Sequence, residues 1–140
     1  AKKKYLNKSL SLTSICINLL LNNEYENAVD LFTKFIAIDD CENFLLLFLL
    51  GRFYFQRNMY EDAIRLLSKS SQIFPCELTF NELGKAHVKL NNLKLAEENF
   101  HLAVNLNCLH TSNDCWKNLF DLYEKEHRID AAKLCKINSL

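Results

Sequence analysis

Asn58-Met59-Tyr60-Glu61-Asp62-Ala63 is a stretch that recurs, with changes, at three other places in the chain. Residues 23–28 keep its Asn, Tyr, Glu and Ala, whereas residues 91–96 keep only the Asn and the Ala. A weaker fourth copy ends at Ala132. The alanines that end the four stretches are separated by 35, 33 and 36 residues. Periods of this length indicate stacked supersecondary units.

Each repeat is expected to form two helices joined by a short turn. In the second repeat, apolar residues before the quoted stretch recur at i, i+3, i+4 and i+7, which is one face of a helix. Asn58 then suits the end of that helix, because Asn tolerates the left-handed conformation. The second helix is expected to begin at Tyr60 and the repeat to end at Pro75. The two predicted faces consist of Leu47, Leu50, Gly51 and Tyr54, and of Ala63, Leu66, Leu67 and Ser70.

The composition agrees with an all-helical chain. Among 140 residues, 49% are hydrophobic, which is enough for a core, and there are only two Gly and one Pro. So few chain breakers disfavour a turn-rich β fold and a glycine-loop nucleotide site. Seventeen basic residues balance seventeen acidic ones, so the basic excess typical of a duplex-binding protein is missing. We therefore expect no nucleic-acid partner.

The repeats resemble the tetratricopeptide repeat (TPR) family. Its 34-residue pattern places a large residue at position 4, a small one at positions 8 and 20, and Pro at position 32. Both glycines of this chain, Gly51 and Gly84, fall at position 8, the single Trp116 at position 4 and the single Pro75 at position 32. The third repeat has Thr79 followed by Glu82, the spacing of a capping box at a helix start.

The resemblance implies an all-α fold, a right-handed superhelical array of antiparallel helix hairpins. We expect about four TPR-like repeats, at 9–43, 44–76, 77–112 and 113–140, in a single domain 9–140 that follows a basic lead-in at 1–8. The fourth repeat is degenerate. Phe120 occupies its small position 8, and Lys136 and Ser139 replace an aromatic residue and an Ala. Its two helices are therefore expected to be splayed or shifted.

Resemblance to this family also implies function, because the first helices of such repeats line a concave groove that binds a peptide or helix of a partner protein. The groove predicted here is apolar in its N-terminal half and carries basic residues beyond, which suits a segment with an acidic group at one end. The residues carried over to the groove are Leu20, Leu45, Phe48, Arg52, Phe55, Asn81, Lys85, Lys89 and Lys117.

Other interpretations of these residues stay open. The apolar half could pack against a second copy of the chain, making it a homodimer or an assembly module of a larger complex. The lysines could simply be solvated. TPR domains that capture the acidic tails of Hsp70 and Hsp90 use a set of Lys, Asn and Arg residues. This chain lacks that set, whether the pattern is placed to start at the first repeat or at the second. We therefore expect a protein partner that is not bound through that carboxylate clamp.

No catalytic, cofactor or metal site is expected. The six cysteines include no C-x-x-C pair, which indicates reduced thiols in an intracellular protein, cytoplasmic or nuclear. Cys108, His110 and Cys115 lack the paired spacing of a zinc site. His87 stands where the family has an aromatic residue and is interpreted as a packing residue. The longest apolar run has seven residues, far short of the roughly twenty that span a membrane, so no membrane partner is expected.

Overall fold

A computed structural model describes residues 2–36, 40–106 and 114–139, with side chains described from Leu12 onward. Within these ranges the chain forms eight α-helices and no strand, joined pairwise by short turns. The expected all-α array of helix hairpins is thereby confirmed. The chain divides into two compact units, Ala1–Ile73 and Phe74–Leu140, and each unit contains two helix pairs.

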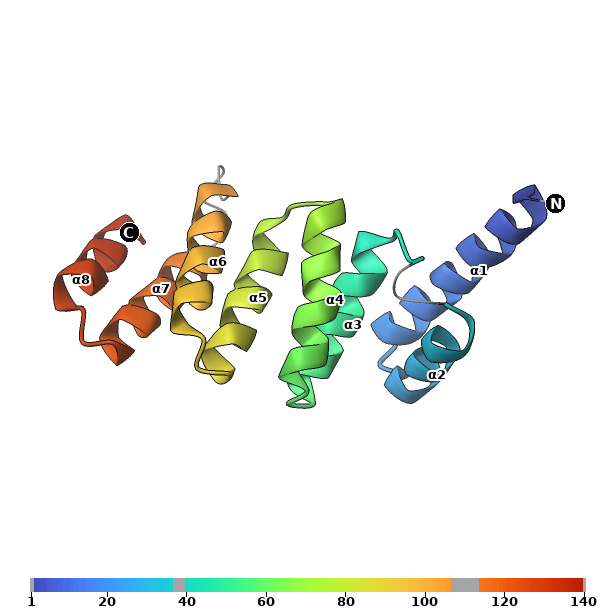
Figure 1. Ribbon diagram of the computed structural model, residues 1–140, viewed down its shortest axis with the longest axis horizontal. Helices are drawn as coiled ribbons and strands as arrows, with labels where there is room; N and C mark the ends of the chain where they lie inside the picture. Colours follow the sequence, from blue (N-terminus) through green and yellow to red (C-terminus); the bar gives the residue numbers. More distant parts are fainter. Residues whose placement is uncertain (1, 37–39, 107–113, 140) are drawn as a thin grey trace. The chain divides into compact units, whose positions relative to one another are not determined.

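The first unit consists of α1 (Lys2–Leu21) paired with α2 (Tyr25–Phe35), and α3 (Phe44–Gln56) paired with α4 (Tyr60–Ile73) (Figure 1). Helices α1 and α3, the first helices of the two pairs, also pack against each other. Helix α1 begins at Lys2, so the basic residues that sequence analysis separated as a lead-in continue the first helix.

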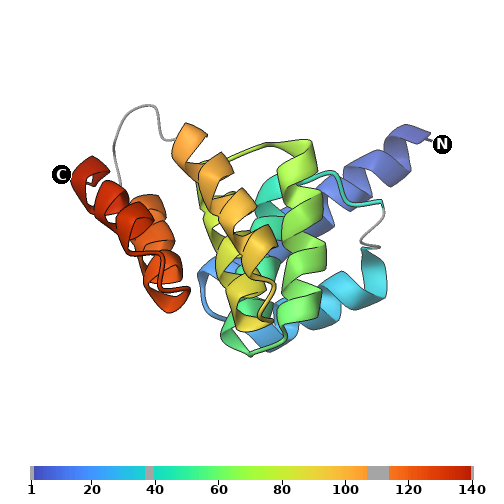
Figure 2. The same cartoon turned by 60° about the vertical axis from the view of Figure 1, so that its left-hand side comes forward.

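The second unit consists of α5 (Glu77–Lys89) paired with α6 (Leu93–Leu106), and α7 (Asp114–Lys125) paired with α8 (Ile129–Asn138) (Figure 2). Helix α7 packs against both α5 and α6. The N-cap of α5 is Cys76, so the capping box predicted at Thr79 is wrong. Thr79 is instead a buried residue of the first helical turn, because the helix begins two residues earlier, at Glu77.

All four turns within the helix pairs have the same backbone geometry. One residue of each turn has a left-handed φ near 60°, and the residue after it donates its N–H to a carbonyl five positions back. At the second turn, Asn58 N–H bonds to Phe55 O at 3.0 Å and Met59 N–H to Tyr54 O at 2.9 Å. This is the Schellman pattern that ends helices, as predicted for Asn58. The four left-handed residues are Asn23, Asn58, Asn91 and His127.

In the α3–α4 pair and in the α5–α6 pair, the two helices lie close together because one helix has glycine where the other has a large residue. A Cβ added to Gly51 would lie 2.6 Å from Leu67 Cγ, and one added to Gly84 would overlap the ring of Phe100. Both large side chains are buried. The predicted faces around them are confirmed in the second pair, where the residues named for α3 and α4 are buried except for the half-buried Tyr54.

The outer pairs depart from this arrangement. In the first pair, Ile15 and Phe35 occupy repeat positions that are apolar in the family, yet 47% and 63% of their surface is exposed. In the fourth pair, Phe120 stands at the small position, and cavities lie on either side of it between α7 and α8. That Phe120 splays or shifts the two helices of this pair stays a prediction.

Candidate protein-binding site

The exposed side of α3 in the first unit carries an apolar surface with one cation. The N-cap of the helix is Asn43, whose side chain accepts a hydrogen bond from Leu46 N–H at 3.0 Å. Its buried face fixes the rotation of the helix, which leaves Leu45 41% exposed and Phe48 half-buried. The Arg52 guanidinium carbon lies 5.7 Å from the centroid of the Phe48 ring, within cation–π range. Three of the predicted groove residues thus share one surface.

A cavity of about 180 Å³ lies beside this surface, between α3 and the α1–α2 turn. Tyr25 and Phe53 stack in it with ring centroids 4.9 Å apart, and Arg52 also contributes to its wall. The cavity therefore combines an aromatic wall with an exposed cation, which suits an apolar side chain next to a carboxylate. Its lining residues are Leu20, Leu21, Asn23, Tyr25, Leu49, Arg52, Phe53 and Gln56.

Two predicted groove residues of the first unit belong more to its interior. Leu20 is only 5% exposed and packs in the core of the unit, although it also lines the cavity. Phe55 is half-buried, and its ring meets Tyr60 edge-on at a centroid distance of 5.4 Å. The accessible part of this candidate site therefore consists of Leu45, Phe48 and Arg52.

The groove residues predicted in the second unit differ in accessibility. Asn81 is 6% exposed, and its Oδ1 accepts a long hydrogen bond of 3.4 Å from Asn118 Nδ2. The Lys85 ammonium lies 2.7 Å from Glu82 Oε1 on the same helix. Asn81 therefore joins helices inside the unit, and Lys85 already has a carboxylate partner. The remaining two, Lys89 and Lys117, are exposed.

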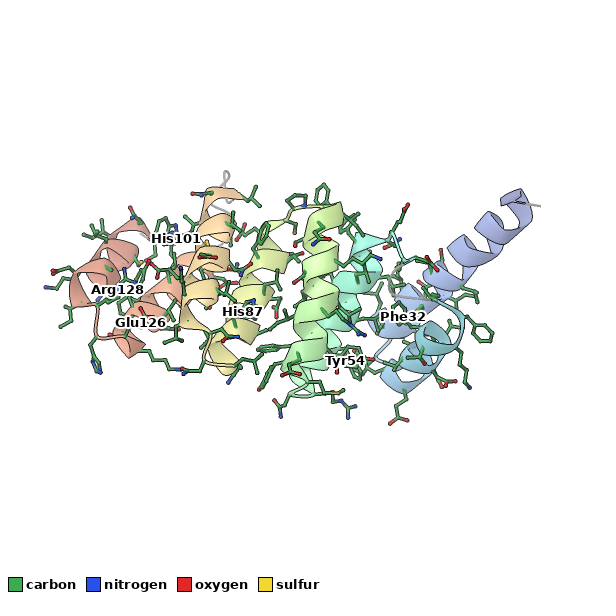
Figure 3. All side chains as sticks on the ribbon, in the orientation of Figure 1. Phe32, Tyr54, His87, His101, Glu126 and Arg128 are labelled. Atoms are coloured by element: carbon green, nitrogen blue, oxygen red, sulfur yellow. The ribbon has the colours of Figure 1, made fainter. Side chains whose placement is uncertain are left out.

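A polar cluster that sequence analysis missed joins α6 to the end of α7 and to the α7–α8 turn (Figure 3). Tyr123 Oη donates to Glu97 Oε1 at 2.8 Å, and Arg128 Nη1 donates to Glu97 Oε2 at 2.9 Å. His101 Nε2 lies 3.0 Å from Tyr123 Oη. Burial alone would raise the pKa of Glu97, but the hydrogen bonds from Tyr123 and Arg128 outweigh it and lower that pKa. The cluster stabilises a helix contact and holds its carboxylate in the ionised form.

Burial also shifts the pKa of two other titratable groups. His87 is half-buried, its Nδ1 has no hydrogen-bond partner among the described residues, and burial lowers the pKa of its imidazole. Burial, with the neighbouring Cys41, raises the pKa of the Cys16 thiol to about 11. The Cys16 thiol donates to Ala28 O at 3.3 Å. Both groups therefore favour their neutral forms.

Among the described residues, no group of three or more His, Cys, Asp or Glu could hold a metal ion. Cys108 and His110, which sequence analysis weighed as ligands, lie outside the described residues, and Cys115 is buried in α7. In the same part of the chain, each helix is too short or too polar to cross a membrane.

Comparisons with known proteins place these observations in context. No protein-family model matches the chain. It is 30% identical over 111 residues to heat shock protein STI1 of Saccharomyces cerevisiae, a match that covers 79% of this chain and 18% of STI1. The chain therefore spans less than a fifth of the length of this relative.

Solved structures of two MamA mutants have a similar fold. For one of them the TM-score is 0.76 at 20% sequence identity, and the match covers 91% of this chain and 73% of the MamA chain. For the other the TM-score is 0.63 at 21% identity, and the match covers 91% of this chain and 92% of the MamA chain. At such identities the likeness concerns the fold alone. Together with the repeated helix pairs, the glycines at position 8 and the four equivalent turns, it shows that the chain has a fold of the tetratricopeptide-repeat type.

Proposed function

We propose that the chain is a non-catalytic protein-interaction scaffold that binds a peptide or helical segment of a partner protein on the exposed side of α3. The observation that carries this proposal is the joint surface of Leu45, Phe48 and Arg52 next to a cavity with an aromatic wall. Exposed apolar surface of this kind typically marks an interaction site. The family resemblance supports the same class of function.

The chemistry of the surface suggests what the partner segment presents. Leu45 and Phe48 offer contact area for an apolar side chain, and the cavity beside them can take part of another. The Arg52 guanidinium, exposed above the Phe48 ring, can bind a carboxylate through two parallel hydrogen bonds. A segment with an apolar anchor followed by an acidic group satisfies both.

A quantitative pull-down from cell extract, with partners identified by mass spectrometry, tests the proposal. Leu45→Glu and Arg52→Glu should each deplete the same partner by about tenfold or more, because either change removes an anchor and adds a like charge. Phe35→Glu and Arg65→Glu are matched controls, since both wild-type side chains are exposed on other helices of the unit. Circular dichroism verifies that the variants fold. A partner that survives both α3 variants would contradict the proposal.

The alternative function is self-association, as a homodimer or within a larger assembly. Exposed apolar side chains on α8, of which Leu134 and Ile137 are the last two, favour it over a monomer. Sedimentation equilibrium distinguishes the two functions, because a scaffold for peptides stays monomeric at concentrations where a dimerisation module does not. We further propose an intracellular site of action and no Hsp70 or Hsp90 tail capture. Acidic tail peptides of these chaperones should therefore not bind.

A further inference from the structure

A second candidate surface lies in the second unit, along the outer side of the α7–α8 pair. Two cavities, of about 390 and 530 Å³, lie between these helices, and both are lined by Phe120 and Lys136. One opens toward the start of α7, beside Trp116, and the other toward its end, beside Glu124. Together they form a groove that Phe120 divides in two. Its lining includes Trp116, Lys117, Phe120, Glu124, Lys133 and Lys136.

The preceding pair of the same unit shows what such a groove can hold. Helix α7 packs against both α5 and α6, and it turns Leu119 and Tyr123 inward, where both are buried with Phe100 of α6. The repeat makes the α7–α8 groove the counterpart of this occupied α5–α6 surface. Its natural occupant is therefore an amphipathic helix that presents its apolar face.

Phe120 restricts which helix fits. In the α5–α6 pair the corresponding residue is Gly84, whose missing side chain lets Phe100 lie against the helix backbone. Phe120 instead fills the middle of the groove and leaves space on both sides. Lys117 and Glu124, one in each cavity, are two helical turns apart, about 10.5 Å at 1.5 Å per residue. A bound helix along α7 would place large apolar side chains at i and i+7, with small residues at i+3 and i+4.

The charges around the groove indicate the sign of the partner. Lys117, Lys133 and Lys136 line it, and no described carboxylate lies within ion-pair distance of their ammonium groups. The carboxylates that line it are Asp114 and Glu124, at its two ends. A helix with acidic residues beside its apolar stripe would pair with the three lysines.

We propose that the α7–α8 groove is a second docking surface, which binds an acidic amphipathic helix of a partner protein with a large–small–large apolar pattern over i, i+3/i+4 and i+7. This surface is separate from the α3 surface of the proposed function. The two could act independently, so a variant that disables one leaves the other intact.

Trp116 makes the proposal directly measurable, because it lines the groove and is the single Trp of the chain. The probe is a synthetic helical peptide with Leu at i and i+7, Ala at i+3 and i+4, and Glu on the flanks. Titration into the full chain should shift Trp116 emission to shorter wavelength and saturate. A Lys133→Glu/Lys136→Glu variant should weaken binding about tenfold or more, whereas the control Lys94→Glu/Lys125→Glu and the α3 variant Leu45→Glu should bind normally.

A second peptide, with Leu instead of Ala opposite Phe120, tests the shape requirement. It should bind the wild-type chain poorly and regain affinity in Phe120→Ala, which joins the two cavities. Three results would overturn the proposal. In the first, the Trp116 signal does not saturate as the acidic peptide is added. In the second, a peptide with Lys instead of Glu flanks binds as tightly as the acidic peptide. Alternatively, Trp116 emission could shift with protein concentration alone, which would make a second copy of the chain the occupant.

Discussion

Single residues decide how each helix pair turns. A left-handed backbone is unfavourable for residues with a Cβ, and Asn bears it better than most. Three turns have Asn, and Tyr25 and Tyr60 donate hydrogen bonds to the side chains of Asn23 and Asn58 at 2.7 and 2.9 Å. The fourth turn has His127 instead, without such support among the described residues.

His127→Gly should therefore stabilise the chain, by about 0.5–1 kcal/mol in free energy of unfolding, because Gly adopts the left-handed region without strain. Urea denaturation measures the change. Asn58→Gly is the matched control and should gain less, since it also loses the hydrogen bond from Tyr60. Equal gains at both positions would show that the residue type of the turn is unimportant.

His87 should make stability depend on pH. Its pKa is lowered by burial in the folded chain, so the unfolded chain binds the proton more tightly. The contribution of neutral His87 to the free energy of unfolding is therefore fully present above the unfolded pKa of about 6.5. It is lost as the pH decreases below that value, by at most about 1.4 kcal/mol per pH unit. Urea denaturation between about pH 5 and pH 7.5 should show a smaller slope for His87→Phe than for wild type. His127→Gln is the control, and an identical slope in His87→Phe would refute the assignment.

Helix pairs depend on matched small and large residues. Gly51 and Gly84 allow Leu67 and Phe100 to lie against the neighbouring backbone. Sequence analysis could predict this, because the small positions and the spacing of their partners are visible in one repeat. It could also predict the left-handed Asn58. Both features are local, and both are confirmed.

Gly51→Ala should lower the free energy of unfolding by about 1 kcal/mol, since overpacking costs about 1–3 kcal/mol and the better helix propensity of Ala offsets about 1. The new Cβ would lie 2.6 Å from the branch carbon of Leu67, which cannot move without displacing its neighbours. In a Leu67→Ala background the same substitution should cost nothing. A double-mutant cycle measures this coupling, and independent effects would contradict the explanation.

Contacts between pairs were not predictable in the same way. No motif in the sequence singles out Glu97, yet it bonds to Tyr123 and Arg128, which lie 26 and 31 residues further along. Leu20 and Asn81 were assigned to a groove, yet both are buried. Which side of a helix is covered depends on the rotation of the next pair, and one repeat does not encode that rotation.

Tyr123→Phe should destabilise the second unit by about 1–2 kcal/mol at neutral pH, because the Glu97 carboxylate loses a hydrogen bond. The lowered pKa of Glu97 means that this stabilisation is present above the usual Glu pKa and is lost as the pH falls through the folded value. Urea denaturation at neutral and acidic pH should therefore show the difference from wild type shrinking in acid. A constant difference would indicate a packing defect. Tyr60→Phe, whose hydroxyl bonds to an exposed Asn, is the control.

At the scale of the whole molecule, each of the two compact units carries one candidate interaction surface. The first unit has the α3 surface with its exposed Arg52, and the second has the groove that Phe120 divides. The sequence pointed to the α3 residues through their repeat positions. It also predicted that Phe120 splays or shifts the helices of the fourth repeat, but the two cavities became visible only once α7 and α8 were placed.

Hydroxyl-radical footprinting of the chain, free and with the partner captured in the pull-down, tests the central claim most directly. The oxidation rates of Leu45 and Phe48 should fall on binding, because the partner covers the exposed side of α3. Phe35 and Leu134, exposed on α2 and α8, should keep their rates. Protection at these two residues, with Leu45 and Phe48 unchanged, would contradict the account and place the binding surface elsewhere.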